Sequence, residues 1–364
     1  MDIFASLPGA IRDGELITHF GNPLIEQREL ASGRAISPLS DRTLIEVAGE
    51  DRLTWLDSIT SQSVGRLHPG ESTELLVLDP QGRIEHAAGV FEDGTSVWLI
   101  ADDADVEKLA AWLKRMVFRS RVTVSVREDA ALVGFLAGGE AEARLSAAAP
   151  NGVPVVWRDP WHQVQPGGHQ YALVDQHPGA EYSWSVALVD DAAALSGPFA
   201  GALAAEALRV AAWRPRWSHE VDERAIPHES DWIRSAVHLS KGCYRGQETV
   251  AKVHNLGHPP RRLAALHLDG SDVVLPAPGD LVFDGEAEVG SVTSAVLHYE
   301  EGPIALAILS RRASTGELTV RSNGTDIAAA QQVIVPADAG ATVGVPRLTR
   351  LSRRPTAEDP RTAR

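Results

Sequence analysis

The chain has 364 residues, of which 44% are hydrophobic and 23% charged. This length predicts two or three domains, and the composition is typical of a globular rather than a disordered protein. The formal net charge of -15 argues against nonspecific binding to nucleic acid, which requires clustered basic residues. The N-terminus lacks a secretory pattern, and no stretch approaches the roughly 18 apolar residues of a membrane span. We therefore expect a cytoplasmic protein, monomeric by default, that contacts neither membrane nor nucleic acid directly.

Residues 1–130 predict an α+β module with a largely antiparallel sheet. Asp79-Pro80-Gln81-Gly82 is typical of a turn between two of its strands. An apolar stripe that ends at Val117 predicts an amphipathic helix beginning at Asp103. The expected strands cover residues 43–47, 74–79, 83–91, 96–101 and 121–126, and a shorter helix is expected between Leu53 and Ile59.

Residues 131–262 predict a second α+β module of the same kind. Its expected strands cover residues 131–137, 153–157, 171–174 and 184–188. A short Ala-rich helix is expected near residues 140–148, and a long helix over residues 198–213, which Pro215 ends.

After Arg262 the pattern changes to short strands separated by Gly and Pro, which predicts a small β-barrel over residues 263–340. The expected strands are 263–268, 281–283, 289–297, 304–309 and 318–320. The Arg- and Pro-rich tail, residues 341–364, has little apolar content and is expected to be disordered.

The segment from Lys241 to Glu248 is the densest cluster of different chemistries in the chain. Its members are Lys241, Gly242, Cys243, Tyr244, Arg245, Gly246, Gln247 and Glu248. The single cysteine cannot form an internal disulfide or hold a metal cluster alone, but positive neighbours favour its reactive thiolate form. Tyr244 offers a face for stacking on a ring, and Gln247 and Glu248 offer groups that pair with a nitrogen heterocycle. Together with Lys252, Arg261 and Arg262, the segment forms a local basic patch that favours a small anionic ligand.

Each of these residues also has a structural interpretation. A free cysteine is usually a small buried hydrophobic residue. The two glycines can simply shape a turn, and Arg245 can pair with Glu248 on a solvated face. From the residues alone, both interpretations stay open.

The segment resembles the signature K-G-C-Y-x-G-Q-E of the YgfZ family, with every fixed position matched. The stretches 226–229 and 79–84 resemble its I-P-x-E and D-x-x-G-R-I elements, and Asp41-Arg42 with Trp55-Leu56 resembles its N-terminal module. The resemblance implies the α+β fold of the related glycine cleavage T-protein, with two modules around a central folate channel and a C-terminal barrel. It also implies tetrahydrofolate or a derivative as cofactor. The partners it implies are iron–sulfur enzymes, some of them tRNA-modifying, whose clusters the protein helps to assemble or repair.

The sequence departs from the T-protein pattern at two places. Ala211 stands where the related proteins have a Glu that binds the pterin ring, so a pterin clamp of that kind is either missing or replaced, with Glu220 and Glu229 as candidates. Glu85 and His86 stand where a pair of acids includes the catalytic Asp. Strict aminomethyl transfer is therefore doubtful, although Glu85 can still act as a carboxylate.

These observations define the predicted site. Cys243 and Glu85 are the expected catalytic residues. The expected cofactor-binding residues are Lys241, Gly242, Tyr244, Arg245, Gly246, Gln247, Glu248, Glu229 and Trp213, with Trp217 and Trp232 as further candidates for the channel wall. No metal site is expected, because the residues between and after His254 and His258 disfavour the helix that would align the two imidazoles.

Three functions compete. The first is a folate-binding protein that maintains iron–sulfur enzymes. The second is a folate-dependent enzyme that transfers or removes a one-carbon unit. The third is a scaffold that keeps the fold but binds another flat ring, since fold alone does not determine function.

Overall fold

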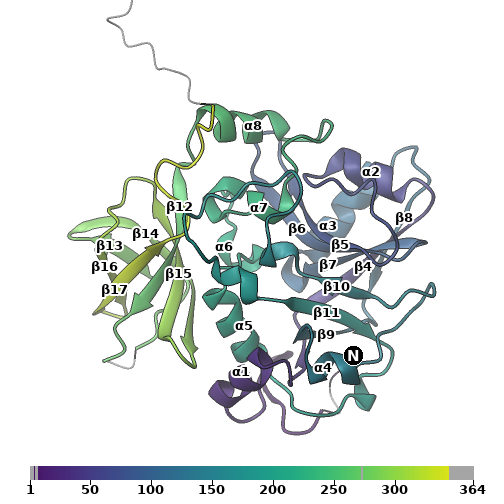
Figure 1. Cartoon of the computed structure of the whole chain (residues 1–364), viewed down its shortest axis with the longest axis horizontal. Helices are drawn as coiled ribbons and strands as arrows, with labels where there is room; N and C mark the ends of the chain where they lie inside the picture. The colour runs from purple at the N-terminus through teal and green to yellow at the C-terminus, as the bar shows by residue number, and fades with distance from the viewer. Residues whose placement is uncertain (1–3, 5–6, 272–273, 344–364) are drawn as a thin grey trace, which may run out of the picture.

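The structure, a computed structural model, describes residue 4 and residues 7–271 and 274–343. Most of the predicted tail, residues 344–364, lies outside the described residues. Within the described part, no helix is both long and apolar enough to cross a bilayer. Two sheets pack together on one side of the molecule and a barrel lies on the other, with α5 (Ala202–Ala211) between them (Figure 1).

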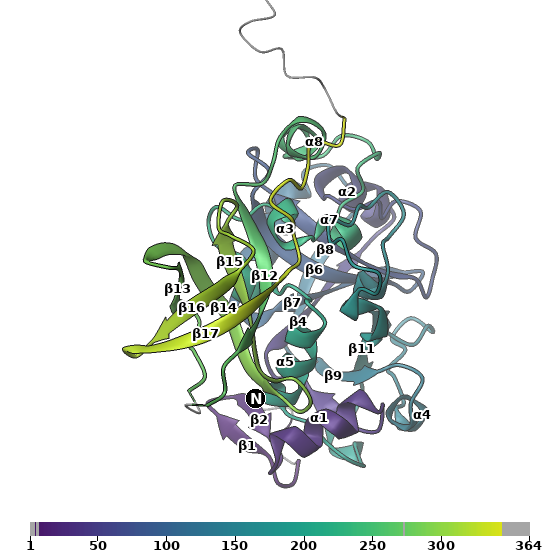
Figure 2. The same cartoon turned by 60° about the vertical axis from the view of Figure 1, so that its left-hand side comes forward.

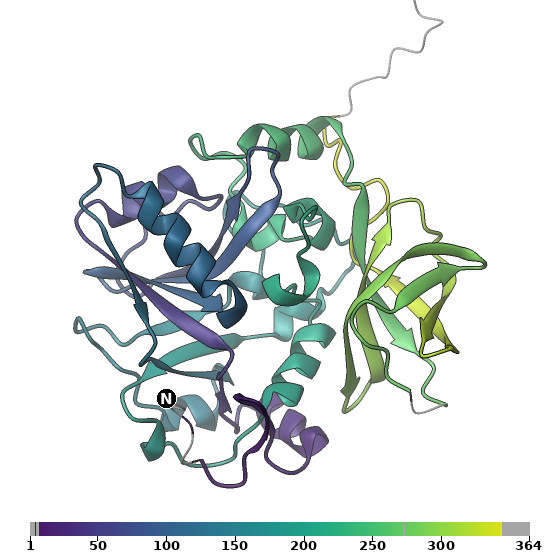
Figure 3. The ribbon, with the colours of Figure 1, turned by 180° about the vertical axis from the view of Figure 1, so that it is seen from behind.

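The first sheet is antiparallel, with the strand order β5-β6-β7-β4-β8. Its strands are β4 (Arg42–Ala48), β5 (Ser72–Leu78), β6 (Ile84–Glu92), β7 (Ser96–Asp102) and β8 (Thr123–Arg127). The outer face is covered by α2 (Arg52–Ile59) and α3 (Asp103–Met116), which Figure 3 shows from behind. The predicted stripe of α3 is confirmed, because Leu109 and Leu113 are buried against Ile45 and Val47 of β4. The inner face packs on the second sheet through Leu44 and Trp98.

The second sheet has the order β10-β11-β9-β3. Its strands are β3 (Ser37–Pro38), β9 (Ala131–Leu136), β10 (Val156–Arg158) and β11 (Trp184–Val189). The hairpin of β1 (Ile11–Asp13) and β2 (Leu16–His19) and the helix α1 (Pro23–Ala31) precede β3. Ser37 and Pro38 pair with β9 of the second sheet. The strand β3 therefore precedes the predicted boundary between residues 130 and 131 in the sequence but belongs to the second sheet in space.

Three details of the second module differ from the prediction. The strand expected at residues 171–174 is absent, because the amides of Tyr171 and Ala172 donate to the carboxylate of Asp231 rather than to a neighbouring strand. The helix expected near 140–148 is shorter, α4 (Glu140–Arg144). The long helix is α5, which ends at Ala211 and is followed by Trp213 with a left-handed backbone, φ 57°.

The C-terminal region is a closed barrel, as predicted, with the order β12-β15-β14-β13-β16-β17. Its strands are β12 (Arg261–Leu268), β13 (Leu281–Asp284), β14 (Ala287–His298), β15 (Gly302–Ser310), β16 (Glu317–Ser322) and β17 (Thr325–Val333). The sequence analysis missed β17, which is rich in Ala and Gln rather than in the branched and aromatic residues that favour strands.

The barrel contacts the helices α5 and α1 of the rest of the molecule. Figure 2 shows it in front of α5, which packs against β14 and β15. The side-chain amide of Gln27, on α1, donates to the carbonyl of Leu297 at 2.9 Å and accepts from the amide of Tyr299 at 2.9 Å. The segment between α5 and the barrel forms α6 (Trp217–Glu220), α7 (Ile233–Ala236) and α8 (Gln247–Leu256), with a 3₁₀ turn at Pro227–Ser230. This segment carries the predicted site.

Candidate functional site

The predicted signature segment lies against the β5–β6 hairpin of the first sheet. Gly246 has a φ of +84°, and a Cβ there would lie 2.6 Å from the carbonyl oxygen of Asp79. Across the contact Gly82 has a φ of +76°, and a Cβ there would lie 3.0 Å from Cβ of Thr249. Glycine is therefore required on both sides, because it alone combines this backbone with so close an approach. The contact fixes the start of α8 on the hairpin turn.

Lys241 holds the other end of the segment. Its side chain is only 3% exposed, and its ammonium group donates to the carbonyls of Asp57, Thr60 and Gln62. These carbonyls lie in the last turn of α2 and in the residues just after it, where a cation is favourable because the last helical carbonyls lack partners. Burial lowers the pKa of Lys241, and the charge of Asp57 opposes that shift. The ammonium group is thus engaged within the protein, and the predicted role of Lys241 in contacting a ligand remains a prediction.

Cys243 is exposed between these two fixed points. A Cβ added at the preceding Gly242 would meet open space. The side-chain amide of Gln247 donates to the carbonyl of Lys241 at 3.2 Å and closes the loop. Tyr244 points inward; it is buried, and burial raises the pKa of its phenol, which has no hydrogen-bond partner among the described residues. The interpretation of Cys243 as a buried hydrophobic residue is therefore wrong, and the thiol is accessible on a well-supported loop.

Arg245 joins this loop to the other predicted catalytic residue. Its guanidinium binds both carboxylate oxygens of Glu85, at 2.6 and 3.3 Å, and both side chains are about one-third exposed. The alternative pairing of Arg245 with Glu248 is not found; Glu248 is exposed in the first turn of α8. The structure thus brings Glu85 of β6 and the signature segment together, which neither stretch could indicate alone.

Beyond Glu85 lies a groove of about 690 Å³, which we call the outer groove. This volume is within the range of about 300–1,000 Å³ of small-molecule sites. It is lined by Asp79, Arg83, Ile84, Glu85, His86, Asp105, Lys108, Ala111, Trp112, Arg115, Trp217, Val221, Asp222 and Glu223.

A histidine–aspartate pair forms part of the wall of the outer groove. His86 Nδ1 lies 2.6 Å from Oδ1 of Asp105, a fully buried residue whose pKa is raised by burial against the influence of His86. The other oxygen, Oδ2, has no hydrogen-bond partner among the described residues. Such a pair orients the imidazole and leaves its second nitrogen able to exchange a proton. A buried carboxylate oxygen without a partner is costly, so it favours a donor from a ligand or water.

Deeper in the molecule is a second, much smaller space of about 100 Å³, which we call the inner cavity. Trp217 lines both the inner cavity and the outer groove, and its indole donates to the carbonyl of Glu85 at 3.0 Å. Trp232 also lines the inner cavity and donates to Oε2 of the buried Glu74, whose Oε1 has no partner among the described residues. The predicted central channel therefore consists of an open outer groove and a small inner cavity with Trp217 between them. The inner cavity is below the volume that a drug-sized ligand occupies.

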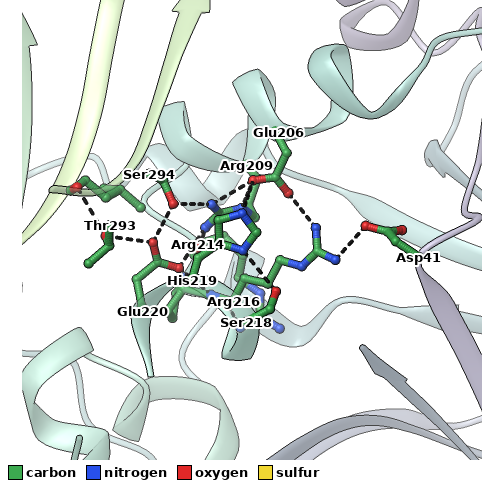
Figure 4. Close-up of polar contacts among 12 residues, drawn as sticks. Asp41, Glu206, Arg209, Arg214, Arg216, Ser218, His219, Glu220, Thr293 and Ser294 are labelled. Carbon is green, nitrogen blue, oxygen red and sulfur yellow. Dashed lines mark hydrogen bonds and ion pairs between the residues drawn. The ribbon is translucent and has the colours of Figure 1, made fainter. Parts of the chain in front are cut away.

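The inner cavity is small because arginines and carboxylates fill the space between the modules. We call the contacts of Arg209, Arg214 and Arg216 the arginine network. Figure 4 shows Glu206 between Arg209 and Arg216, at 2.8 and 2.9 Å, with Asp41 beyond Arg216 at 2.6 Å.

The network connects both sheet modules with the barrel. Arg214 binds Glu74 of β5 at 2.6 Å and Asp159 at 2.9 Å. Glu220 accepts from Arg209 at 3.0 Å and from Ser294 of the barrel at 2.6 Å (Figure 4). Burial alone would lower the pKa of Arg209, but the charges of Glu206 and Glu220 raise it, so the guanidinium stays protonated. The network therefore stabilises the packing of the two sheets and the barrel against one another.

Glu229 and Trp213, which were predicted to bind the cofactor, form contacts with other residues of the protein. The same holds for Glu220, the other candidate to replace the Glu that is missing at Ala211. Glu229 is buried and binds Arg261 through both oxygens, at 3.1 and 2.8 Å. Trp213 is buried and packs edge-on against His177, with ring centroids 5.3 Å apart. Glu220 belongs to the arginine network. Neither Glu220 nor Glu229 has the free carboxylate that would replace the Glu missing at Ala211.

Within the described residues, no group of three or more His, Cys, Asp or Glu side chains is placed to hold a metal ion. The expectation that His254 lies outside a helix is wrong, because α8 continues to Leu256, one residue before Gly257. His254 Nδ1 pairs with the hydroxyl of Tyr171 at 2.8 Å, whereas His258 pairs with the carbonyl of Ala339 at 2.9 Å. The two imidazoles thus have different partners.

The sequence analysis missed two acids with potential roles, Glu74 and Asp105. Glu74 lies within a buried strand, and no local pattern marks it. Asp105 lies in the first turn of α3, where an acid is expected for helix stability alone. Only the packing of α3 against β6 shows that Asp105 orients His86.

Comparison with known proteins agrees with this architecture. No family model matches the chain. It superposes on the crystal structure of the glycine cleavage system aminomethyltransferase T from Bartonella henselae with a TM-score of 0.70, covering 90% of this chain and 94% of that chain at 17% identity. The fold is therefore that of an aminomethyltransferase-T protein, with the predicted mixed sheets and barrel.

Proteins with a similar sequence give a second comparison. The chain is 26% identical, over 62% of its length, to the mitochondrial iron–sulfur cluster assembly factor IBA57 homolog of Pyricularia oryzae, and this match covers 55% of that protein. It is 27% identical, over 75% of its length, to the tRNA-modifying protein YgfZ of Yersinia enterocolitica, of which the match covers 83%. The chain is thus similar in sequence to YgfZ and IBA57 proteins, which agrees with the resemblance drawn from the signature. It spans little more than half of the Pyricularia protein.

Proposed function

We propose that this protein supports the assembly or repair of iron–sulfur enzymes, including tRNA-modifying ones, with Cys243 as its reacting thiol and a reduced folate as its cofactor. The observation that carries the proposal is the exposure of Cys243 between two fixed points, the buried ammonium of Lys241 and the glycine contact at Gly246. A thiol that is merely structural would be buried. The names of the YgfZ and IBA57 relatives support the iron–sulfur and tRNA connection.

The outer groove is the part of the molecule that fits a folate best. Its volume of about 690 Å³ suits such a ligand, whereas the inner cavity of about 100 Å³ does not. Trp112 and Trp217 offer aromatic faces for stacking, and Glu85, about one-third exposed, offers a carboxylate to the N–H groups of a pterin ring. When bound, a tetrahydrofolate would supply a nitrogen that carries a one-carbon unit.

A second function, one-carbon transfer or demethylation, is favoured by one observation. His86, oriented by Asp105, lines the same groove as Glu85. A groove with an oriented imidazole can accept a proton from a bound amine, which simple storage of a folate does not require. Turnover would appear as methylene-tetrahydrofolate when the protein is incubated with tetrahydrofolate and a methylamine-type donor.

Two experiments test the main proposal. Calorimetric titration with the stable reduced folate 5-formyltetrahydrofolate should show binding, and His86→Ala or Trp217→Ala should weaken it. In cells that lack their own YgfZ, the protein should restore the activity of an iron–sulfur tRNA-modifying enzyme, Cys243→Ala should not, and Ser240→Ala serves as the neighbouring control. Full restoration by Cys243→Ala would contradict the role of the thiol, and failure of every folate to bind would contradict the cofactor.

A further inference from the structure

Phe118, in the turn between α3 and β8, is 86% exposed, more than any other large hydrophobic residue that the structure describes. The turn lies on the side of the first sheet away from the barrel (Figure 1). The φ of Phe118 is 42°, in the left-handed region that glycine usually occupies where a helix ends. A phenylalanine is strained there and gains no burial in return. The stability of the folded chain therefore does not account for Phe118.

The turn is held firmly on both sides of Phe118. Before it, the indole of Trp55, on α2, donates to the carbonyl of Met116 at 3.0 Å. After it, the carboxylate of Asp51 accepts from the backbone amide of Arg121 at 2.8 Å and from its guanidinium at 2.9 Å. The backbone that presents the aromatic ring is thus preorganised, so binding through the ring costs little ordering entropy.

Cations surround Phe118, and the stretch that carries them has no acid. Residues 109–127 contain no Asp or Glu, although the chain has 49. Lys114, Arg115 and Arg119 are exposed and form no ion pair or side-chain hydrogen bond with any residue that the structure describes. The guanidinium of Arg119 lies 5.3 Å from the centroid of the Phe118 ring. On a chain with a net charge of -15, such a local positive surface attracts an acidic partner.

The residue types around the turn are those of a binding surface. We define the Phe118 surface as Lys114, Arg115, Met116, Phe118 and Arg119. Met116 is exposed as well, at 38%. Aromatic residues, Met and Arg are enriched in the buried centre of protein–protein interfaces. A single exposed apolar side chain needs no explanation, whereas a strained aromatic ring beside a Met and three unpaired cations calls for one.

We propose that the Phe118 surface docks a partner protein that is acidic around an apolar pocket, with the Phe118 ring inserted into that pocket. The cations speed the encounter and orient the partner, and the ring supplies most of the affinity. Arg115 also lines the outer groove, so a docked partner lies at the rim of that groove. This inference goes beyond the proposed function, because it holds whether or not a folate binds.

Two acids beside the turn favour a protein over a nucleic acid as the partner. Glu50 and Asp51 both bind Arg121. They would repel a phosphate backbone that followed the turn, because binding to nucleic acid depends on a succession of unopposed cations. A protein pocket, by contrast, has to contact only the ring and the cations nearest to it.

Photo-cross-linking in cells that produce this protein identifies the partner. The photoreactive p-benzoylphenylalanine replaces Phe118 in one sample. In the control sample it replaces Leu173, which is 83% exposed and belongs to the second module. We expect an adduct with an acidic protein from position 118 that is absent from position 173. The captured protein, once purified, is the probe for calorimetric titration.

The titrations compare three variants with the unchanged protein. Phe118→Gly should weaken binding at least tenfold, the loss expected for an aromatic residue that dominates an interface. Because glycine tolerates the left-handed backbone, the same variant should unfold at a similar or higher temperature, which separates lost binding from lost folding. Arg119→Glu should weaken binding about three- to tenfold and reduce its salt dependence. Leu173→Ser is the matched control and should stay within about twofold.

Several results would overturn the docking surface. They are adducts at position 118 that match those at position 173, an adduct that ribonuclease removes, a captured protein that is a second copy of this chain or has no net negative charge, and equally tight binding by Phe118→Gly. Each of them leaves the folate titration and the Cys243 variant to decide the proposed function independently.

Discussion

Two sets of arginine–carboxylate pairs lie close together in this molecule, and they differ in solvent exposure. In the arginine network the side chains of Arg209 and Arg214 are 6% and 9% exposed, and they join the two sheets to the barrel. At the candidate site the pair of Arg245 and Glu85 is about one-third exposed. Buried charges must keep their partners, whereas an exposed pair exchanges partners with water or ligand at little cost. The network therefore maintains the architecture, and the exposed pair can respond to a ligand.

The largest expected effect comes from breaking the network. Arg214→Ala leaves the buried carboxylates of Glu74 and Asp159 without their cation and should lower the free energy of unfolding by about 3–5 kcal/mol. Urea denaturation measures this change. Arg158→Ala is the control, since Arg158 and its partner Glu142 are 43% and 32% exposed and the pair is worth about 1 kcal/mol or less. Equal losses in the two variants would show that burial does not distinguish the pairs.

Substitution of Lys241 tests whether its charge maintains the architecture, as the buried arginine network does, or responds to a ligand, as the exposed pair of Arg245 and Glu85 can. Lys241→Ala removes the hydrogen bonds of a buried ammonium to three carbonyls at the end of α2 and should cost about 2–3 kcal/mol in unfolding free energy. The sequence alone predicted a loss of ligand binding instead. If thermal unfolding is unchanged while folate affinity falls, Lys241 contacts the ligand and its assignment to the structural set is wrong.

The two glycines of the signature, Gly242 and Gly246, allow a crowded position to be compared with an open one. Gly246→Ala places a Cβ 2.6 Å from a backbone oxygen at a φ of +84°, which should destabilise the protein by about 1–3 kcal/mol. Gly242→Ala meets open space, and its effect should stay within about 0.5 kcal/mol. The rate of Cys243 alkylation by iodoacetamide in each variant reports whether the loop has moved. A larger loss of stability in Gly242→Ala would contradict the geometry.

The smallest expected effect on stability belongs to the exposed pair. Arg245→Ala should change the free energy of unfolding by less than about 1 kcal/mol, because both charges remain hydrated. Its effect on folate affinity should be larger than its effect on stability, since Glu85 loses its partner beside the groove. Calorimetry and urea denaturation on the same sample compare the two quantities, and a stability loss as large as that of Arg214→Ala would remove the distinction between the two sets.

The elements that could be predicted from the sequence are those with a regular apolar period, and the site residues that could be predicted are those of the signature. The apolar stripe of α3 and the alternating strands of the first sheet were identified because their burial follows a simple period. The pairing of Arg245 with Glu85 was not predicted, because the two residues are brought together only by the packing of the hairpin turn on α8. The same holds for Asp105, whose role depends on contact between α3 and β6. Similarly, the strand expected at Tyr171 is replaced by hydrogen bonds to Asp231, a residue 60 positions away.

The pairing of β3 with β9, and the bonds of Gln27 to β14, have a consequence for dividing the chain into pieces. The first 40 or so residues are needed at two distant places, the edge of the second sheet and the side of the barrel. A recombinant fragment cut between the sheets would expose the edge of β9, and one cut before the barrel would exchange the Gln27 hydrogen bonds to the barrel for bonds to water. Ribosomal synthesis delivers these contacts in the order sheet, then barrel, so the amino-terminal segment has to await the carboxyl-terminal one before its last hydrogen bonds can form.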